Sequence, residues 1–271
     1  MGRTNGTEER KKETRRGGGI MTRHGGMKTL KRLNTPKFLQ IKRKHGKFFV
    51  KPSAGPHPSR FCLPLLHIVR DLLKIVDTHR EAKKLIGLGH FKVDGKIVRD
   101  KSYPVGFMDV FSIEKMKKHY RILPDSHYGL ILFEISEEES LFKLCRIIKK
   151  TIVKGGHIQL NLHDGKNILI KVSDPRNPKE DIYKRMDILK ISIPEQEIMK
   201  VLKFKENNLA IIMSGKNIGQ VGKIISIKKL FGPKANTVSI EHNGGHTETL
   251  YDYTFVIGED QSEINLPKIS S

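Results

Sequence analysis

Residues 62–113 carry basic side chains between apolar positions, and acidic side chains are sparse on the face that these basic side chains are expected to share. An array of ammonium and guanidinium groups on a rigid support neutralises phosphates, and RNA duplexes are recognised mainly through phosphates, 2′-hydroxyls and shape. The alternative is an ordinary solvated face, since charge runs usually are that. We expect the array to bind RNA through Arg70, Lys74, Lys83, Lys84, Lys92, Arg99 and Lys101.

A second candidate is the glycine-rich segment 214–222. Its glycines permit a tight loop and a close approach of backbone, and the tip carries a cation and an amide. Such a tip can meet phosphates or a neighbouring protein; the alternative is a turn that merely closes a barrel. The spacing matches neither a Walker A loop nor a dinucleotide-binding fingerprint. The residues concerned are the loop glycines Gly215, Gly219 and Gly222, with Lys216 and Asn217 at the tip.

Sequence patterns typical of catalysis or metal binding are missing. The chain contains no His-Glu-x-x-His, no Gly-x-Ser-x-Gly and no Cys/His spacing of a zinc site. His163 and Asp164 could act as an acid/base pair, but Asp164 before Gly165 is better explained as a turn. Cys62 and Cys145 form no disulfide framework, so we expect buried thiols in a reducing compartment. We expect no enzymatic activity, metal, cofactor or small-molecule substrate.

The N-terminal region holds more than half of the chain's formal charge of +22, because its first fifty residues carry fifteen Lys or Arg and three acidic side chains. Residues 1–26 offer too little apolar surface to offset their chain entropy, so we expect a disordered basic tail. Over 27–61, prolines and phenylalanines interleave with the charge, which favours an extended arm over a solvated linker. Its expected RNA contacts are Lys28, Lys31, Arg32, Lys37, Lys42, Arg43, Lys51 and Arg60.

So much positive charge implies a polyanionic partner. An anionic membrane is disfavoured, because the sequence has no apolar run of ~18 residues that could span a bilayer. Its basic N-terminus is also not followed by the apolar core of a signal peptide. Nucleic acid is the remaining class of partner.

Two helices and a hairpin are expected to position the basic array. Apolar residues recur at helical spacing over 65–76, and an Asp-Thr pair caps a second helix over 79–86. The Asp-Gly pair at 94–95 is a two-residue hairpin signal, and another short strand covers 109–113. The pattern predicts a compact α+β unit over 62–113.

Beyond that unit the pattern is mostly β. Residues 114–203 contain many short alternating segments with turn signals, which is typical of a small barrel. Over 143–153 the periodicity leaves helix and strand open. Residues 204–260 have the layout of an SH3-like barrel, and we expect 261–271 to be frayed. The whole chain is therefore expected to be a multi-domain α+β protein.

Several motifs resemble the eukaryotic and archaeal family of small-subunit ribosomal protein four, and the resemblance covers about residues 27–260. Residues 1–26 have no clear counterpart in that family's usual start, and its basic C-terminal helix is missing after Pro267. The segment 214–222 is similar to a KOW motif. The other motifs are Pro52-Ser53-Ala54-Gly55-Pro56-His57, Val93-Asp94-Gly95-Lys96-Ile97, Tyr103-Pro104-Val105-Gly106 and His163-Asp164-Gly165.

The resemblance implies an αL-type RNA-binding module over 62–113, a central β-barrel and a KOW-type SH3-like barrel. It implies a structural constituent of the small (40S-type) ribosomal subunit that binds rRNA and neighbouring ribosomal proteins. The chain would work in the cytosolic ribosome and pass through the nucleolus during assembly. Two alternatives stay open: a pseudouridine-synthase-like RNA-modifying enzyme that uses the module for targeting, and an RNA-binding regulator outside the ribosome.

Overall fold

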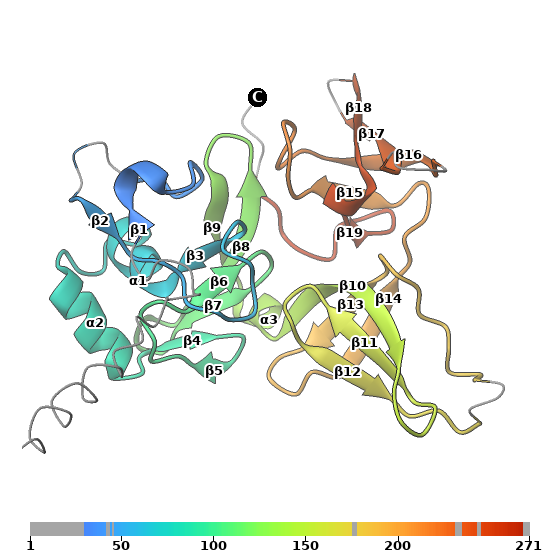
Figure 1. Cartoon of the computed structure of the whole chain (residues 1–271), viewed down its shortest axis with the longest axis horizontal. Coiled ribbons are helices and arrows are strands. Elements are labelled where there is room, and N and C mark those ends of the chain that lie inside the picture. The colour runs from blue at the N-terminus through green and yellow to red at the C-terminus, as the bar shows by residue number, and fades with distance from the viewer. Residues whose placement is uncertain are drawn as a thin grey trace, which may run out of the picture.

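The computed structural model describes residues 30–41, 44, 46–174, 178–230, 235–242 and 245–267. Within them the backbone forms three five-stranded sheets and two short strand pairs (Figure 1). The expected tail, 1–26, and three expected RNA contacts lie outside these residues: Lys28, Lys42 and Arg43. In the described part, no helix is long and apolar enough to cross a membrane.

The N-terminal arm folds back on itself. Strand β1 (Leu30–Lys31) pairs antiparallel with β2 (Phe48–Phe49), and a 3-10 turn, Arg32–Asn34, follows β1. Leu39 and Phe49 are buried in the same core as the helices of the next unit. The arm is thus partly folded rather than simply extended, because its large apolar side chains gain free energy by leaving water.

The helical part of the module is α1 (Leu65–His67), a π-helical turn Ile68–Leu72, and α2 (His79–Gly87). Thr78 caps α2: its hydroxyl accepts a hydrogen bond from the Glu81 N–H, and the Glu81 carboxylate accepts one from the Thr78 N–H. This capping box confirms the predicted start of the second helix. The first helix ends at Leu72, short of the expected residue 76.

The sheet of the module runs past residue 113, where we expected the unit to end. At the tip of its first hairpin, Asp94 and Gly95 have φ of 48° and 74°, the left-handed geometry of a two-residue turn. Residues 118–135, expected in the central unit, pair with this sheet instead. Its strands in spatial order are β5 (Lys96–Ile97), β4 (Phe91–Val93), β7 (Val110–Ile113), β8 (Lys118–Asp125) and β9 (Gly129–Ile135).

Short elements complete the module. Strand β3 (Cys62–Pro64) enters it from the arm and pairs antiparallel with β6 (Pro104–Gly106). A 3-10 turn, Glu114–Met116, connects β7 to β8. After β9, Ser136 caps the short helix α3 (Glu137–Ser140) by accepting the Glu139 N–H.

The central sheet is organised around one long strand, β10 (Phe142–Ile152). Its first half pairs with β13 and its second half with β11, with a register shift between Ile147 and Lys149. The segment that periodicity left open between helix and strand is therefore strand. The other strands are β11 (Ile158–Leu162), β12 (Asn167–Ile170), β13 (Ile188–Ser192) and β14 (Ile198–Leu202), in the order β12-β11-β10-β13-β14.

The C-terminal sheet has the order β18-β17-β16-β15-β19. Phe107 and Leu123 of the module share its hydrophobic core, and the 3-10 turn Tyr251–Tyr253 leads into its last strand. The central and C-terminal sheets lie beside each other, on the side of the molecule opposite α2 (Figure 1). The strands are β15 (Leu209–Ile212), β16 (Val221–Lys228), β17 (Thr237–His242), β18 (Gly245–Leu250) and β19 (Thr254–Gly258).

The segment that follows β19 is packed, so the expectation of a frayed end is wrong up to residue 267. Ile264 is buried, and the Glu263 N–H donates to the Ile257 carbonyl at 2.9 Å. The Glu263 carboxylate accepts hydrogen bonds from Lys190 and Lys200 of the central sheet. The burial of Ile264 and the ion pairs of Glu263 hold this segment against the two sheets.

Candidate nucleic-acid interface

A pocket of about 430 Å³ lies where the arm meets the module. Phe48 and Lys51 come from the arm, and Arg70, His79 and Lys101 come from the module. We call this site the cationic pocket, because the fold brings three of the expected RNA-binding cations together in it. The exposed phenylalanine ring can stack on a base while the cations meet phosphates.

The arm is fixed to the walls of the cationic pocket. The Phe49 ring, buried behind Phe48, meets the His67 ring edge-on at a centroid distance of 5.1 Å. The Ser53 N–H donates to the Ser102 carbonyl at 2.8 Å, and the Ser53 hydroxyl donates to the Asp100 carboxylate at 3.0 Å. These contacts hold Lys51 of the arm close to Arg70 and Lys101 of the module before any ligand binds.

Arg70 is held in place by the residue that follows it. Its Nε and Nη2 atoms donate to the two carboxylate oxygens of Asp71, both at 2.8 Å, and Asp71 also lies 2.7 Å from His67 Nδ1. Burial opposes ionisation, but hydrogen bonds from His67 and Arg70 hold the pKa of Asp71 well below its usual range. The Arg70 guanidinium is therefore a partly compensated charge with a fixed direction, which its position in the sequence did not reveal.

His79 lies among the cations of the pocket, and its pKa is lowered there. Burial, and then the positive charges of Lys101, Arg70 and Lys83, lower the pKa of His79. Lys101 Nζ lies 3.4 Å from His79 Nε2, so a neutral imidazole accepts its hydrogen bond. The positive charges that add to this lowering are the ones that an anion in the pocket would meet.

The other expected cations of the module do not line the pocket, and they differ in exposure and pairing. Lys83 and Lys84 are exposed on α2, and Arg99 is exposed in the loop after β5. Lys74 is exposed at a left-handed turn, with φ of 50°, that ends the first helix. Lys92 forms an ion pair with Glu114, so its charge is already compensated in part.

The expected cations of the arm line other surfaces. Lys31 is exposed on β1, and Arg32 and Lys37 line an open hollow of about 660 Å³ beside it. Lys37 and Arg60 also line a further pocket that the C-terminal sheet helps to form. The arm therefore presents cations on more than one side.

The loop 214–222 packs against the module rather than joining the cationic pocket. A Cβ atom on Gly219, where φ is 83°, would lie 3.0 Å from Asp125 Cα, and one on Gly222 would lie 2.0 Å from the Glu241 carbonyl oxygen. Gly215 also has a left-handed φ, 101°. Close packing thus explains the glycines, and the expected tip residues differ in exposure: Lys216 is exposed and Asn217 is partly buried.

A buried charge cluster joins the arm, the module and the central sheet, and sequence reasoning missed it. Lys143 Nζ lies 2.8 Å from Asp94, 2.5 Å from Asp109 and 3.0 Å from Asp164, each measured to a carboxylate oxygen. Burial alone would lower the pKa of Lys143, but the carboxylates of Asp109 and Asp94 raise it well above its ordinary value. The buried charge cluster comprises His57, Asp94, Asp109, Lys143, Asp164 and Lys166.

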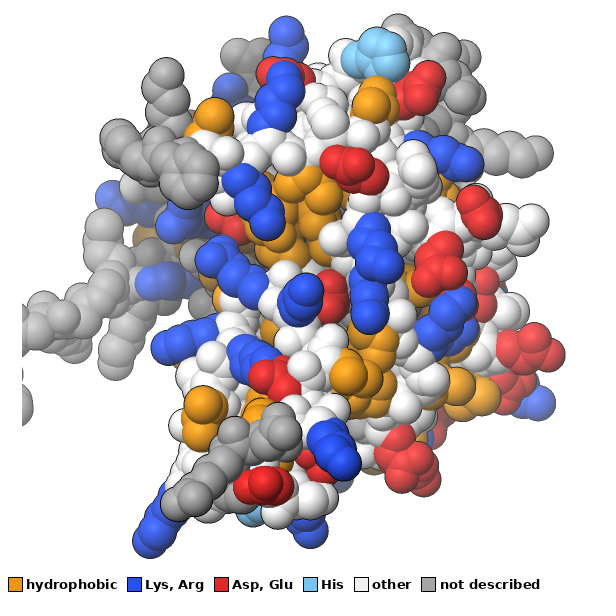
Figure 2. All heavy atoms as spheres, turned by 90° about the vertical axis from the view of Figure 1, so that its right-hand side faces the viewer, with side chains coloured by type: hydrophobic (Ala, Val, Ile, Leu, Met, Phe, Trp, Pro, Cys, Tyr) orange, Lys and Arg blue, Asp and Glu red, His pale blue; other side chains and the backbone are white. Residues whose placement is uncertain are grey.

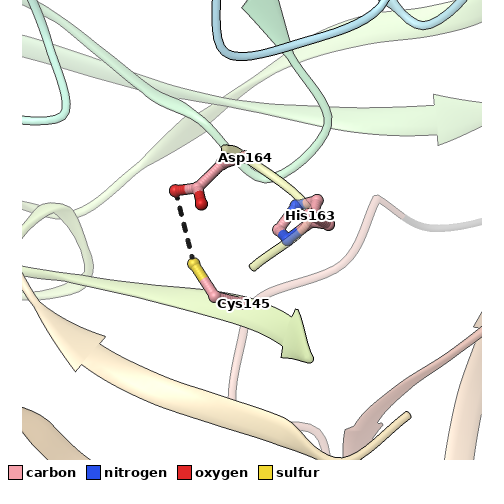
Figure 3. A group of neighbouring side chains, drawn as sticks. All are labelled: Cys145, His163 and Asp164. Atoms are coloured by element: carbon pink, nitrogen blue, oxygen red, sulfur yellow. Dashed lines mark hydrogen bonds between the residues drawn. The ribbon is translucent and has the colours of Figure 1, made fainter. Parts of the chain in front are cut away.

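Cys145, His163 and Asp164 lie close enough together to suggest a metal site (Figure 3). Their donor atoms are already engaged. The Cys145 thiol donates to Asp164, and burial raises its pKa well above the ordinary value. His163 Nδ1 accepts the Arg146 N–H, and Nε2 lies 3.3 Å from the Phe107 carbonyl, to which its N–H donates. A protonated thiol and an occupied imidazole do not fit a metal ion.

Comparison with known proteins decides what the chain is related to. Three family models match it: the RS4NT (NUC023) domain over residues 24–60, the S4 domain over 71–111 and the ribosomal family S4e over 116–198. The chain is 52% identical to the small ribosomal subunit protein eS4 of Staphylothermus marinus, across 92% of this chain and 99% of that protein. The chain belongs to the ribosomal S4e family.

Other members are similar over nearly their whole length. The eS4 proteins of Aeropyrum pernix and Methanocaldococcus jannaschii are 49% and 46% identical, over 98% and 100% of their lengths and 92% and 91% of this chain. The crystal structure of the 30S ribosomal protein S4e from Thermoplasma acidophilum matches with a TM-score of 0.60 at 34% identity. The match covers 72% of this chain and 94% of that one. The resemblance read from the sequence is thereby confirmed.

Proposed function

We propose that this member of the S4e family is a structural constituent of the small ribosomal subunit and holds rRNA through its arm and its S4 module. The relatives are small ribosomal subunit proteins, and the comparisons lend no support to the RNA-modifying enzyme considered above. The cationic pocket is the observation that carries the RNA contact, since Lys51, Arg70 and Lys101 converge there beside an exposed aromatic ring.

Other exposed cations of the module extend this contact. Lys74, Lys83, Lys84 and Arg99 are exposed on the module and can meet further phosphates along an RNA backbone. Arg70 is oriented by Asp71, because two hydrogen bonds to one carboxylate fix the plane of the guanidinium relative to the RNA. The arm adds Lys31, Arg32 and Lys37 on its other side.

The domain plan inferred from the sequence belongs to the same proposal. The five-stranded sheet of β15–β19 and the close-packed glycines of 214–222 support a KOW-type SH3-like barrel over 204–260. The long strand β10, shared between two sets of pairings, supports a small central barrel. Both units would add contacts to the RNA and to neighbouring proteins.

The face of the central and C-terminal sheets favours protein neighbours. On the side of the molecule shown in Figure 2, Lys and Arg side chains stand among Asp and Glu, with apolar patches between them. Ion pairs such as Lys228–Glu248 and Arg185–Asp252 hold cations of these sheets. A surface that mixes both charge signs with apolar patches is better suited to bind a neighbouring ribosomal protein than to bind RNA phosphates. The cytosolic ribosome, with a nucleolar stage during assembly, is the location we propose.

Incorporation into ribosomes tests the function. The full chain should co-sediment with small subunits at one copy per subunit, whereas a regulator would be substoichiometric and exchangeable. Lys83→Glu with Lys84→Glu should prevent incorporation while the fold persists, because both side chains are exposed on α2. The matched control is Lys149→Glu with Lys154→Glu, which makes the same charge change at exposed positions of β10 and of the turn that follows it. Normal incorporation of the α2 variant would contradict the proposal.

A further inference from the structure

A pocket of about 550 Å³ opens where three separate parts of the chain meet. Phe38 and Phe61 come from the arm, Tyr128 from the β8–β9 turn, Met213 from the end of β15, and Tyr253 from the 3-10 turn before β19. We call it the junction pocket. It shares no lining residue with the cationic pocket, and its size lies in the range of ~300–1,000 Å³ that small-ligand sites occupy.

The walls of the junction pocket are fixed by close contacts. A Cβ atom on Gly129 would lie 2.5 Å from Phe38 Cβ, so only glycine lets the arm approach the turn so closely. The Asp125 carboxylate accepts the N–H groups of His127 and Tyr128 at 3.0 and 2.9 Å, which fixes the backbone of the turn. Gly219 lets the C-terminal loop reach the same turn. A pocket built this way loses little entropy when it binds a ligand.

The chemistry of the lining is aromatic and cationic. No acidic side chain stands among the described residues that line the pocket. Aromatic rings stack on any unpaired base, and neighbouring cations take the phosphate of the same nucleotide. The aromatic side chains are Phe38, Phe61, Tyr128 and Tyr253, and the cationic ones are Lys37 and Arg60.

We propose that the junction pocket holds an unstacked nucleotide of a single-stranded RNA segment, with its base against the aromatic side chains and its phosphate on Lys37 and Arg60. The inference rests on the RNA binding proposed above and names a second mode of contact. The cationic pocket offers three cations and one exposed aromatic ring, whereas the junction pocket offers four aromatic side chains to a base that has left its helix.

The chain contains no tryptophan, so Tyr128→Trp introduces a single reporter into the junction pocket. Tyr128 is 56% exposed, so the substitution leaves the core intact. Ile152→Trp, on β10 and 78% exposed outside the pocket, is the matched control. Titration of the full chain with octauridylate should quench the Tyr128→Trp fluorescence saturably and leave Ile152→Trp nearly unchanged. Adding Lys37→Ala and Arg60→Ala should weaken that binding severalfold.

An octaglutamate peptide tests whether the pocket binds an acidic protein segment instead of RNA. Absence of quenching by octauridylate would overturn the inference, and so would quenching by octaglutamate that octauridylate cannot displace, because that result would assign the pocket to an acidic protein segment. Lys51→Ala with Lys101→Ala separates this inference from the proposed function. That pair should weaken binding to full-length rRNA while the quenching by octauridylate persists.

Discussion

The His57 imidazole of the arm lies 3.0 Å, Nε2 to Oδ1, from the Asp109 carboxylate of the module. Asp109 also accepts the Gly106 N–H at 2.7 Å and a hydrogen bond from Lys143. A Cβ atom on Gly106 would lie 2.2 Å from His57 Cγ, so the absence of a side chain there makes room for the ring. One carboxylate therefore ties the arm, the module and the central sheet together.

Replacing Lys143 by Met should destabilise the protein by about 3–5 kcal/mol, because removal of one partner leaves buried carboxylates without compensation. Lys143 is 1% exposed and contacts three of them. Urea denaturation of the full chain measures the change. Lys149→Met, at an exposed position of the same strand, is the control and should shift the free energy of unfolding by no more than about 0.5 kcal/mol. Equal effects of the two substitutions would show that the cluster does not hold the fold.

Stability should fall as pH drops below about 6.5. Burial, together with the charge of Lys143, lowers the pKa of His163 to about 3. In the unfolded chain the same imidazole has the ordinary histidine pKa of about 6.5. Between the folded and the unfolded pKa, the unfolded chain binds a proton that the folded chain does not. Acidification therefore lowers the free energy of unfolding by about 1.4 kcal/mol per pH unit for this group. Asp109 and Asp164, whose folded pKa values are lowered, add a further loss below about pH 4.

Urea unfolding at pH 7, 6 and 5 checks the contribution of His163. His163→Gln should reduce the slope of the unfolding free energy against pH by about 1.4 kcal/mol per pH unit, since glutamine does not titrate. His246→Gln, at an exposed position on β18, should leave the dependence unchanged. Identical slopes for wild type and His163→Gln would contradict the assignment.

Gly219→Ala should destabilise the chain by about 1–3 kcal/mol, because φ of 83° is strained for alanine. Its Cβ would also press on the backbone of Asp125 and Ser126. Gly87→Ala is the control: a Cβ there meets open space at the end of α2. Thermal unfolding compares the two, and a Gly219→Ala protein as stable as Gly87→Ala would show that the loop does not depend on this contact.

Local structure was largely predictable from the sequence. The Thr78 cap and the Asp94-Gly95 turn were identified correctly, because capping and two-residue turns depend on neighbouring residues. Asp164 does lie in the predicted turn, where its Oδ1 accepts the Lys166 N–H. Local pattern also identified the strand over 109–113, although it placed 118–135 in the central unit, since pairing partners are chosen by packing.

Contacts between distant residues escaped prediction. Asp94 was interpreted only as a turn residue, yet its carboxylate binds ammonium groups 49 and 72 residues away in the chain. Lys92 was counted as a free cation because its partner Glu114 joins it only when β4 pairs with β7. Spacing within an element carries no information about such pairs. The cationic pocket was anticipated only as three separate lysine or arginine positions.

Salt dependence of rRNA binding tests the central claim most directly. If the full chain contacts about eight phosphates, log K should fall with log[salt] at a slope of about −6 to −7. Lys51→Ala with Lys101→Ala should make that slope shallower by about 1 for each lost contact. A slope near zero for the wild type, or an unchanged slope for the double variant, would contradict the account of the cationic pocket as a phosphate-binding site.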